Sequence, residues 1–296
     1  MKITRISAPA KLNLFLDVTG RRDNGYHEID SIMQSVSLID ELNIEIDSGS
    51  GIEVACSSPF APSGEKNIVW RAAEKYLTEN KINASLKIEL TKNIPSPAGM
   101  GGGSADAAAL LRELNRHFGA MDYDELVSLA LTVGSDVPFC LRNGTQRVRG
   151  LGDKLEPIRD FMYDNIILIA ISGEDVPTSQ AYKALDEKYD NFRDYVPSRS
   201  PKPLIAAIEK HDDIKAVCAG MYNIFEDVVL PHCPKAQYAK NTMLNCGALG
   251  AMMSGSGSAV FGIFRMEDED KADFVKHKLS VLGIGVHFSS DFYKTL

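Results

Sequence analysis

The stretch 95-PSPAGMGGGSADAAALLREL-114 contains four glycines within five residues, directly before an alanine-rich segment with helical spacing. These glycines are Gly99, Gly101, Gly102 and Gly103. Ordering a glycine costs more backbone entropy than ordering any other residue, so four glycines this close together indicate a specific structural or functional requirement. Bare glycines let backbone amides converge, and a helix over about 104–118 adds unpaired N–H groups and a positive dipole end. The sequence therefore predicts a phosphate site, where a side chain at Gly102 or Gly103 should weaken binding.

The loop differs from the common phosphate-binding motifs. No lysine follows Gly103, as a Walker A loop requires, and Ser104 stands where a dinucleotide fingerprint needs its third glycine. The chain also lacks the HRD and DFG segments of protein kinases. Ser104 is open to two interpretations, a helix N-cap or a ligand of a phosphate-bound cation.

Composition limits the class of protein. The chain has 296 residues, 44% of them hydrophobic, and a formal net charge of −8, which disfavours a nucleic-acid binder but allows an anionic small-molecule substrate. Its five cysteines form no CxxC pair and are typical of reduced thiols in a cytosolic protein. No signal peptide or apolar membrane span is evident, so we expect a cytoplasmic protein with no membrane or nucleic-acid partner.

Strands and helices alternate irregularly, which favours an α+β fold over a doubly wound parallel sheet. In the strand 10–18, Leu12 and its alternating neighbours form an apolar face, while Lys11 and Asn13 lie side by side on the other. Further strands are expected within 31–46, 85–90, 165–171, 248–264 and 285–290. Helices are expected within 65–80, 122–134, 178–190, 201–222 and 270–283, and a hairpin around Asn143-Gly144 within 136–150.

Three ordered motifs resemble those of the GHMP small-molecule kinases. They are the glycine loop, the N-terminal strand 8-APAKLNLFLDV-18, and 252-MMSGSGSAVFGIF-264. The resemblance implies an α+β fold of two domains with the active cleft between them. Residues 1–155 would form a ribosomal-protein-S5-like, ATP-binding domain with an unusual left-handed βαβ crossover, and residues 156–296 a ferredoxin-like domain.

Within this superfamily, three segments resemble the branch that acts on a cytidine diphosphate ester of methylerythritol. They are Pro9–Leu14, Gly25-Tyr26-His27 and Gly134–Phe139. The implied reaction transfers the γ-phosphoryl group of ATP, accompanied by Mg²⁺, to the 2-hydroxyl of this substrate, in the non-mevalonate route to isoprenoid precursors. The resemblance leaves a monomer or a homodimer open.

The resemblance also assigns roles to residues on the ATP side. The triphosphate cradle would be formed by Pro95, Ser96, Pro97, Ala98, Gly99, Met100, Gly101, Gly102, Gly103, Ser104 and Ala105. Ser104 is the candidate contact for Mg²⁺. Asn67 and Lys92 correspond to positions near the adenine or ribose, although each residue alone fits equally well a helix-start amide and a solvated lysine. The 254–258 glycine segment would lie near the phosphates or the acceptor.

The catalytic and acceptor-binding roles follow in the same way. Asp136 would accept or orient the hydroxyl proton, and Lys11 would stabilise its charge and the developing charge of the phosphoryl group. Whether Asp136 acts as a base or as an orienting charge stays open at this stage. The cytidine substrate would be bound by Asn13, Tyr26, His27, Thr178 and Tyr182, with Tyr26 and Tyr182 stacking on the base and His27 bonding its edge.

Two other functions are compatible with parts of this pattern. One is another kinase of the superfamily, acting on homoserine or mevalonate. The Gly-Tyr-His segment argues against it, because neither of these substrates contains a nucleobase on which the segment could stack. The other is a catalytically silent nucleotide-binding regulator, against which the paired Lys11 and Asp136 argue. ADP release with each acceptor in turn distinguishes the three.

Overall fold

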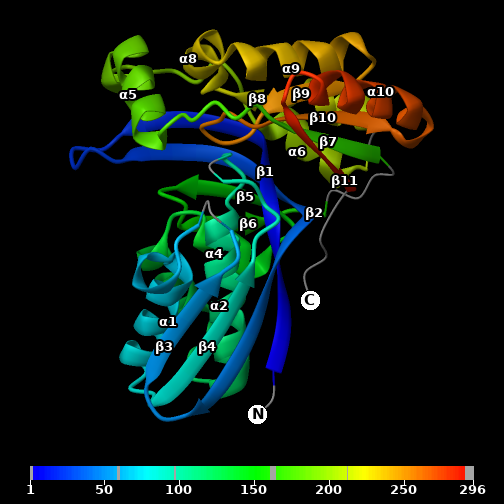
Figure 1. The fold of residues 1–296 in the computed structure, drawn as a ribbon. Coiled ribbons are helices and arrows are strands. Elements are labelled where there is room, and N and C mark those ends of the chain that lie inside the picture. The colour runs from blue at the N-terminus through cyan, green and yellow to red at the C-terminus, as the bar shows by residue number, and fades with distance from the viewer. Residues whose placement is uncertain (1–2, 59–60, 97, 161–164, 212, 291–296) are drawn as a thin grey trace. The chain divides into compact units, whose positions relative to one another are not determined.

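The computed structural model describes residues 1–296 except 1–2, 59–60, 97, 161–164, 212 and 291–296 (Figure 1). Its strands are β1 (Ile3–Arg21), β2 (His27–Ser48), β3 (Gly51–Cys56), β4 (Ala84–Thr91), β5 (Thr145–Gly150), β6 (Lys154–Pro157), β7 (Asn165–Ile171), β8 (Tyr222–Asn223), β9 (Gly250–Met253), β10 (Val260–Arg265) and β11 (Gly285–Ser290). Its α-helices are α1 (Ile68–Glu79), α2 (Gly102–Phe118), α3 (Tyr123–Val133), α4 (Val137–Arg142), α5 (Thr178–Lys188), α6 (Lys202–Glu209), α7 (Ile214–Ala219), α8 (Glu226–Val229), α9 (Pro234–Asn245) and α10 (Glu269–Ser280).

The chain divides into two compact units, each built from separate segments. The first comprises Met1–Lys11, Leu38–Ser96 and Gly101–Asn143, and the second comprises Leu12–Ser37, Pro97–Met100 and Gly144–Leu296. The long strands β1 and β2 and the glycine loop therefore each contribute to both units. A division into domains at residues 155 and 156 stays a prediction.

In the first unit, helices pack on a small mixed sheet. β4 pairs in parallel with β3 and in antiparallel register with the second half of β2. Alternate residues of β4 are buried, as expected for a strand with one covered face. The predicted helices α1, α2 and α3 are present, and α2 ends at Gly119 in the left-handed conformation. A capping box between Asp122 and Glu125 begins α3.

The hairpin predicted around Asn143-Gly144 is wrong. The apolar run before it forms helix α4, with Asp136 at the N-cap and Pro138 in the first turn, where proline is tolerated. Asn143 and Gly144 both have positive φ and end this helix before β5 begins. The hairpin of this region instead joins β5 to β6. Asn143-Gly144, a pair typical of hairpin turns, here ends a helix. The sequence alone did not distinguish the two cases, because a buried apolar run of this length fits a strand or a helix.

In the second unit, a four-stranded antiparallel sheet has the order β11-β7-β10-β9. Helices α9 and α10 lie along one face of this sheet (Figure 1). Their buried side chains, among them Met243 and Val275, join Leu168 of β7 and Phe264 of β10 in one hydrophobic cluster. The predicted strands at 165–171, within 248–264 and at 285–290 are confirmed.

Strand β1 is buried on both faces along its middle, not on one face only. Leu12 and Leu14 are buried as expected, but so are the polar residues that alternate with them, Lys11, Asn13 and Asp17. Burying polar groups costs free energy unless they are paired, so each of these residues needs a partner. This strand therefore carries polar side chains into the interior.

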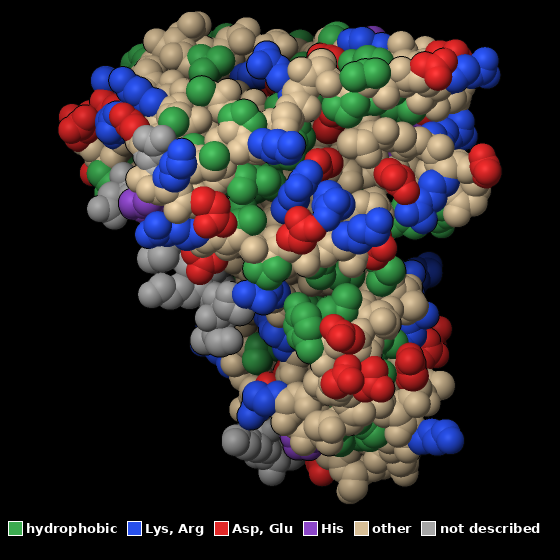
Figure 2. Space-filling view, turned by 180° about the vertical axis from the view of Figure 1, so that it is seen from behind, with side chains coloured by type: hydrophobic (Ala, Val, Ile, Leu, Met, Phe, Trp, Pro, Cys, Tyr) green, Lys and Arg blue, Asp and Glu red, His purple; other side chains and the backbone are tan. Residues whose placement is uncertain are grey.

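The face shown in Figure 2 mixes basic and acidic side chains. Among the described residues no helix has the length and apolarity needed to span a membrane. All five cysteines are free thiols, and Cys140, Cys218 and Cys233 are buried.

Candidate active site

Lys11 and Asp136 form an ion pair within the first unit. The Lys11 Nζ lies 3.4 Å from Asp136 Oδ2, and the lysine side chain is only 5% exposed, against 29% for the aspartate. β1 carries Lys11, and Asp136 occupies the N-cap of α4 without making a side-chain capping bond. The carboxylate is thus partly open to solvent and is not used to hold its own helix.

The glycine loop passes directly beside this pair. Gly101 has a φ of +67°, which disfavours any side chain, and a Cβ there would lie 3.0 Å from Lys11 Cγ and 3.7 Å from Asp136 Oδ2. Gly101 is also the N-cap of α2. The ion pair therefore lies beside the unpaired N–H groups at the start of α2. This arrangement is suited to binding an anion and to placing charged side chains next to it.

Helix α2 begins two residues earlier than the sequence indicated. It starts at Gly102, so Ser104 lies inside its first turn and is not a cap; the N-cap is Gly101, which has no side chain to offer. Of the two interpretations of Ser104, the structure removes the capping one. Its half-buried side chain stays the candidate contact for a cation on the phosphates.

Within the second unit, the other glycine segment packs on the phosphate loop. The Ser254 hydroxyl donates to the Gly99 carbonyl oxygen, at 3.2 Å. A Cβ at Gly99 would collide with the carbonyl oxygen of Ser254, and one at Gly255 would lie 2.8 Å from that of Gly99. The structure thus brings together two glycine motifs that are 155 residues apart. Pro97, predicted to belong to the cradle, lies outside the described residues.

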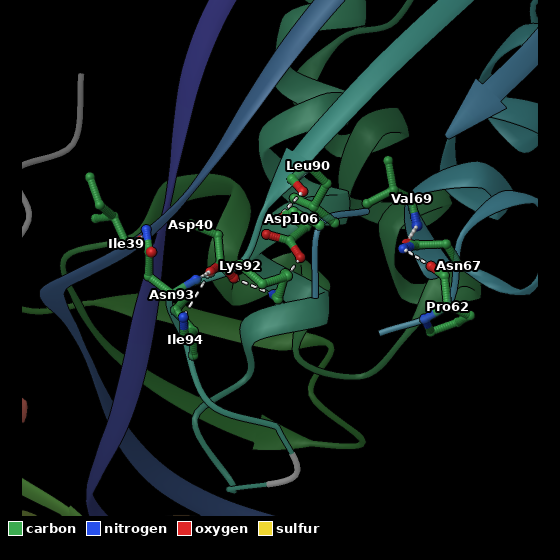
Figure 3. A network of polar contacts seen from close by, with 11 residues as sticks. Ile39, Asp40, Pro62, Asn67, Val69, Leu90, Lys92, Asn93, Ile94 and Asp106 are labelled. Atoms are coloured by element: carbon green, nitrogen blue, oxygen red, sulfur yellow. Dashed lines mark hydrogen bonds and ion pairs between the residues drawn. The ribbon is translucent and has the colours of Figure 1, made fainter. Parts of the chain in front are cut away.

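Both ATP-side residues outside the loop have protein partners (Figure 3). Asn67 caps α1: its Oδ1 accepts from the Val69 N–H at 2.9 Å, and its Nδ2 donates to the Pro62 carbonyl at 2.7 Å. Lys92 is not a solvated lysine, because its side chain is 5% exposed and ion-paired with Asp40 and Asp106. That these two residues lie near ATP stays a prediction. Both side chains are already bonded to other groups of the protein.

The candidate base-binding residues lie in the second unit. Tyr26, directly before β2 at the end of the turn that follows β1, is 65% exposed. The His27 ring stacks on Tyr182 with centroids 4.5 Å apart, and its Nε2 lies 2.6 Å from Asp186 Oδ1. His27 therefore covers one face of Tyr182, and the sandwich predicted between Tyr26 and Tyr182 is not formed on that face.

The two remaining acceptor-side candidates differ in exposure. Asn13 is fully buried, and its side-chain amide donates to the Ser31 hydroxyl at 2.9 Å. This hydrogen bond fixes the side chain away from solvent. Thr178, at the start of α5, is exposed, and its hydroxyl lies 3.0 Å from that of Ser256 in the 254–258 segment. Thr178 thus joins the group of residues around the second glycine motif.

Three residues with evident roles were missed by the sequence analysis. Asp186 fixes one nitrogen of His27, and Asp40 and Asp106 hold Lys92. Asp106 carried a usable signal, because it is a carboxylate within an otherwise alanine- and leucine-rich helix face. Asp40 and Asp186 carried none, since each meets its partner only through tertiary contacts.

Comparison with known proteins places this geometry in a family. The model of the GHMP kinases N terminal domain matches residues 67–144, and that of the GHMP kinases C terminal matches residues 204–283. A protein of Acetivibrio thermocellus named 4-diphosphocytidyl-2-C-methyl-D-erythritol kinase is 39% identical over 91% of this chain and 93% of its own. The chain belongs to the GHMP kinase family, in the branch of the 4-diphosphocytidyl-2-C-methyl-D-erythritol kinases.

Further relatives agree with this branch of the GHMP kinases. One of the same name from Clostridium botulinum is 38% identical over 88% of this chain and 90% of its own. A crystal structure of 4-(cytidine 5'-diphospho)-2C-methyl-D-erythritol kinase superposes with a TM-score of 0.77 at 31% identity, covering 98% of this chain and all of that one. Homoserine kinase from Cytophaga hutchinsonii, at 20% identity and a TM-score of 0.76, shares the fold alone.

Proposed function

We propose that this chain transfers the γ-phosphoryl group of ATP to the 2-hydroxyl of 4-diphosphocytidyl-2-C-methyl-D-erythritol, in the non-mevalonate route to isoprenoid precursors. The observation that carries the proposal is the Lys11–Asp136 pair beside Gly101. Phosphoryl transfer needs a phosphate cradle, positive charge and a group that receives the hydroxyl proton. These three features meet here within one unit of the chain.

In the proposed mechanism, Asp136 accepts or orients the proton of the attacking hydroxyl. Its partial exposure leaves room for a substrate group, and the absence of a capping bond leaves its oxygens available. Lys11, held by burial, sits where positive charge stabilises the phosphoryl group as negative charge develops on it. The amides of Gly101 to Gly103 would bind the triphosphate at the start of α2.

Mg²⁺ is expected to arrive with ATP. Within the described residues, no group of three or more His, Cys, Asp or Glu side chains is arranged to hold a metal. Magnesium on a nucleotide commonly takes one or two protein ligands and otherwise phosphate oxygens and water, so the lone Ser104 hydroxyl fits this kind of site. When bound, the ion would neutralise charge on the phosphates.

The acceptor proposal predicts a selective effect at Tyr26. Because this ring is exposed, stacking on the cytosine would be its main interaction, and Tyr26→Ala should raise the KM of the cytidine substrate about 10- to 100-fold. The KM of ATP should stay within about twofold. Tyr26→Phe, which keeps the stacking face, serves as the matched control in the same steady-state assay. An equal rise in both KM values would make Tyr26 a structural residue.

The function is tested by measuring ADP release with the cytidine substrate, homoserine and mevalonate separately. We expect turnover with the first alone. Turnover with either of the others would assign a different kinase activity, and turnover with none would favour a nucleotide-binding regulator. We also propose that the enzyme acts in the cytoplasm, where ATP is available, as a monomer or a homodimer.

A further inference from the structure

Three buried charged side chains flank the phosphate loop in the first unit (Figure 3). Lys92 lies just after β4, its Nζ 2.7 Å from Asp106 Oδ2 on α2 and in contact with Asp40 Oδ2 on β2. The side chains are 5%, 2% and 0% exposed, respectively. A buried ion pair contributes little net stability compared with apolar packing, so such a group points to a role in geometry.

Their contacts join the two ends of the loop. Asp40 Oδ1 accepts from the backbone N–H groups of Asn93, at 2.5 Å, and Ile94, at 2.8 Å, where the chain enters the loop. Asp106 lies one turn into α2, where the chain leaves it. Lys92 bridges the two carboxyl groups, and these two contacts together set the position of residues 92–94 relative to the start of α2.

Gly102, the first residue of α2, lies directly against this group. A Cβ there would be 3.0 Å from Ile94 Cγ2 and 3.2 Å from Lys92 Nζ. The backbone at Gly102, where N–H groups are expected to bind phosphate, therefore packs against Lys92 and Ile94. A shift of either side chain would move these N–H groups. Since preorganised donors act through their exact placement, a small displacement would be costly.

We propose that Asp40, Lys92 and Asp106 form a charged clamp that positions the phosphate loop, and that Lys92 serves ATP binding through this clamp and not by touching ATP. This inference rests on the proposed function and makes the three side chains positioning residues. It revises the expectation that Lys92 approaches the adenine or ribose.

The ionisation of Asp106 within the clamp provides an independent readout. Two carboxyl groups face one ammonium, and burial raises the pKa of Asp106 to about 8, with Lys92 opposing this rise and Asp40 adding to it, so that Asp106 is mostly protonated at neutral pH. The Cys140 thiol of α4 also interacts electrostatically with Asp106. As pH rises through about 8, Asp106 gains a negative charge near the helix start, where it opposes an anionic ligand.

The test is a double-mutant cycle on the full-length protein, with ATP affinity measured by calorimetry without the acceptor. Lys92→Met should weaken ATP binding about 100-fold. Asp106→Ala should also weaken it, and the double variant should be no worse than the poorer single variant. Lys87→Met, at an exposed lysine of β4, is the control and should bind ATP normally. Additive losses would mean that Lys92 contacts ATP directly and would overturn the proposal.

Asp106→Asn gives a second test if Lys92→Met does not fold. Between pH 7 and 9 the wild type should lose about 3- to 30-fold in ATP affinity, while Asp106→Asn, which cannot ionise, should lose less. Identical pH profiles would contradict the clamp. Because these measurements need no acceptor, a wrong acceptor assignment would leave them valid, whereas a wild type that does not bind ATP would overturn both proposals.

Discussion

Asp136→Asn is expected to lower kcat by about 10²- to 10⁴-fold while both substrates still bind. Asparagine matches aspartate in size but neither accepts a proton nor offers a negative charge to Lys11, 3.4 Å away. Because Asp136 makes no side-chain capping bond, the substitution removes no support from α4. The measurement is kcat from ADP release together with calorimetric affinities for ATP and for the cytidine substrate. Retained affinity with lost turnover identifies a group that acts in the transition state.

A second aspartate provides the matched control for this experiment. Asp122 is also an N-cap, but its side chain does bond the Glu125 N–H in a capping box. Asp122→Asn should therefore affect the stability of α3 slightly and leave kcat unchanged. Turnover of Asp136→Asn close to that of Asp122→Asn would remove Asp136 from the catalytic assignment.

Gly99→Ala is expected to weaken ATP binding about 100-fold, because it displaces the phosphate loop. Gly99 has a φ of +70°, and an added Cβ would collide with the Ser254 carbonyl oxygen and lie 3.2 Å from the carbonyl carbon. Neither backbone can yield without separating the loop from the 254–258 segment. Calorimetric titration with ATP measures the effect directly, and circular dichroism shows whether the variant is folded.

Gly119→Ala separates displacement of the loop from simple backbone strain. Gly119, at the C-terminal end of α2, has a similar φ of +62°, but nothing lies within 4 Å of the position that its Cβ would occupy. It should lose about 1–2 kcal/mol of stability, as a left-handed alanine costs, with unchanged ATP affinity. If Gly99→Ala bound ATP as well as Gly119→Ala does, the contact between the two glycine motifs would have no part in the site.

Local patterns in the sequence predicted most elements of the fold. The alternation of β1, the apolar spacing of α1 and the acidic cap of α3 depend on neighbours in the chain, so they could be read directly. The hairpin at Asn143-Gly144 failed because the same turn residues can end a helix. The second face of β1 was also misjudged, since burial of Lys11 and Asn13 depends on what packs against the strand.

By itself, the sequence determined that a bare glycine loop precedes a helix, which is sufficient for an anion site, and it singled out Lys11 and Asp136 by resemblance. Only the tertiary structure placed these two side chains together beside Gly101 and put Ser104 inside α2. It also changed Lys92 from a solvated lysine into the centre of a buried charged clamp. The physical reason is that glycine and capping preferences act over a few residues, whereas burial and ion pairing depend on residues brought together from distant parts of the chain.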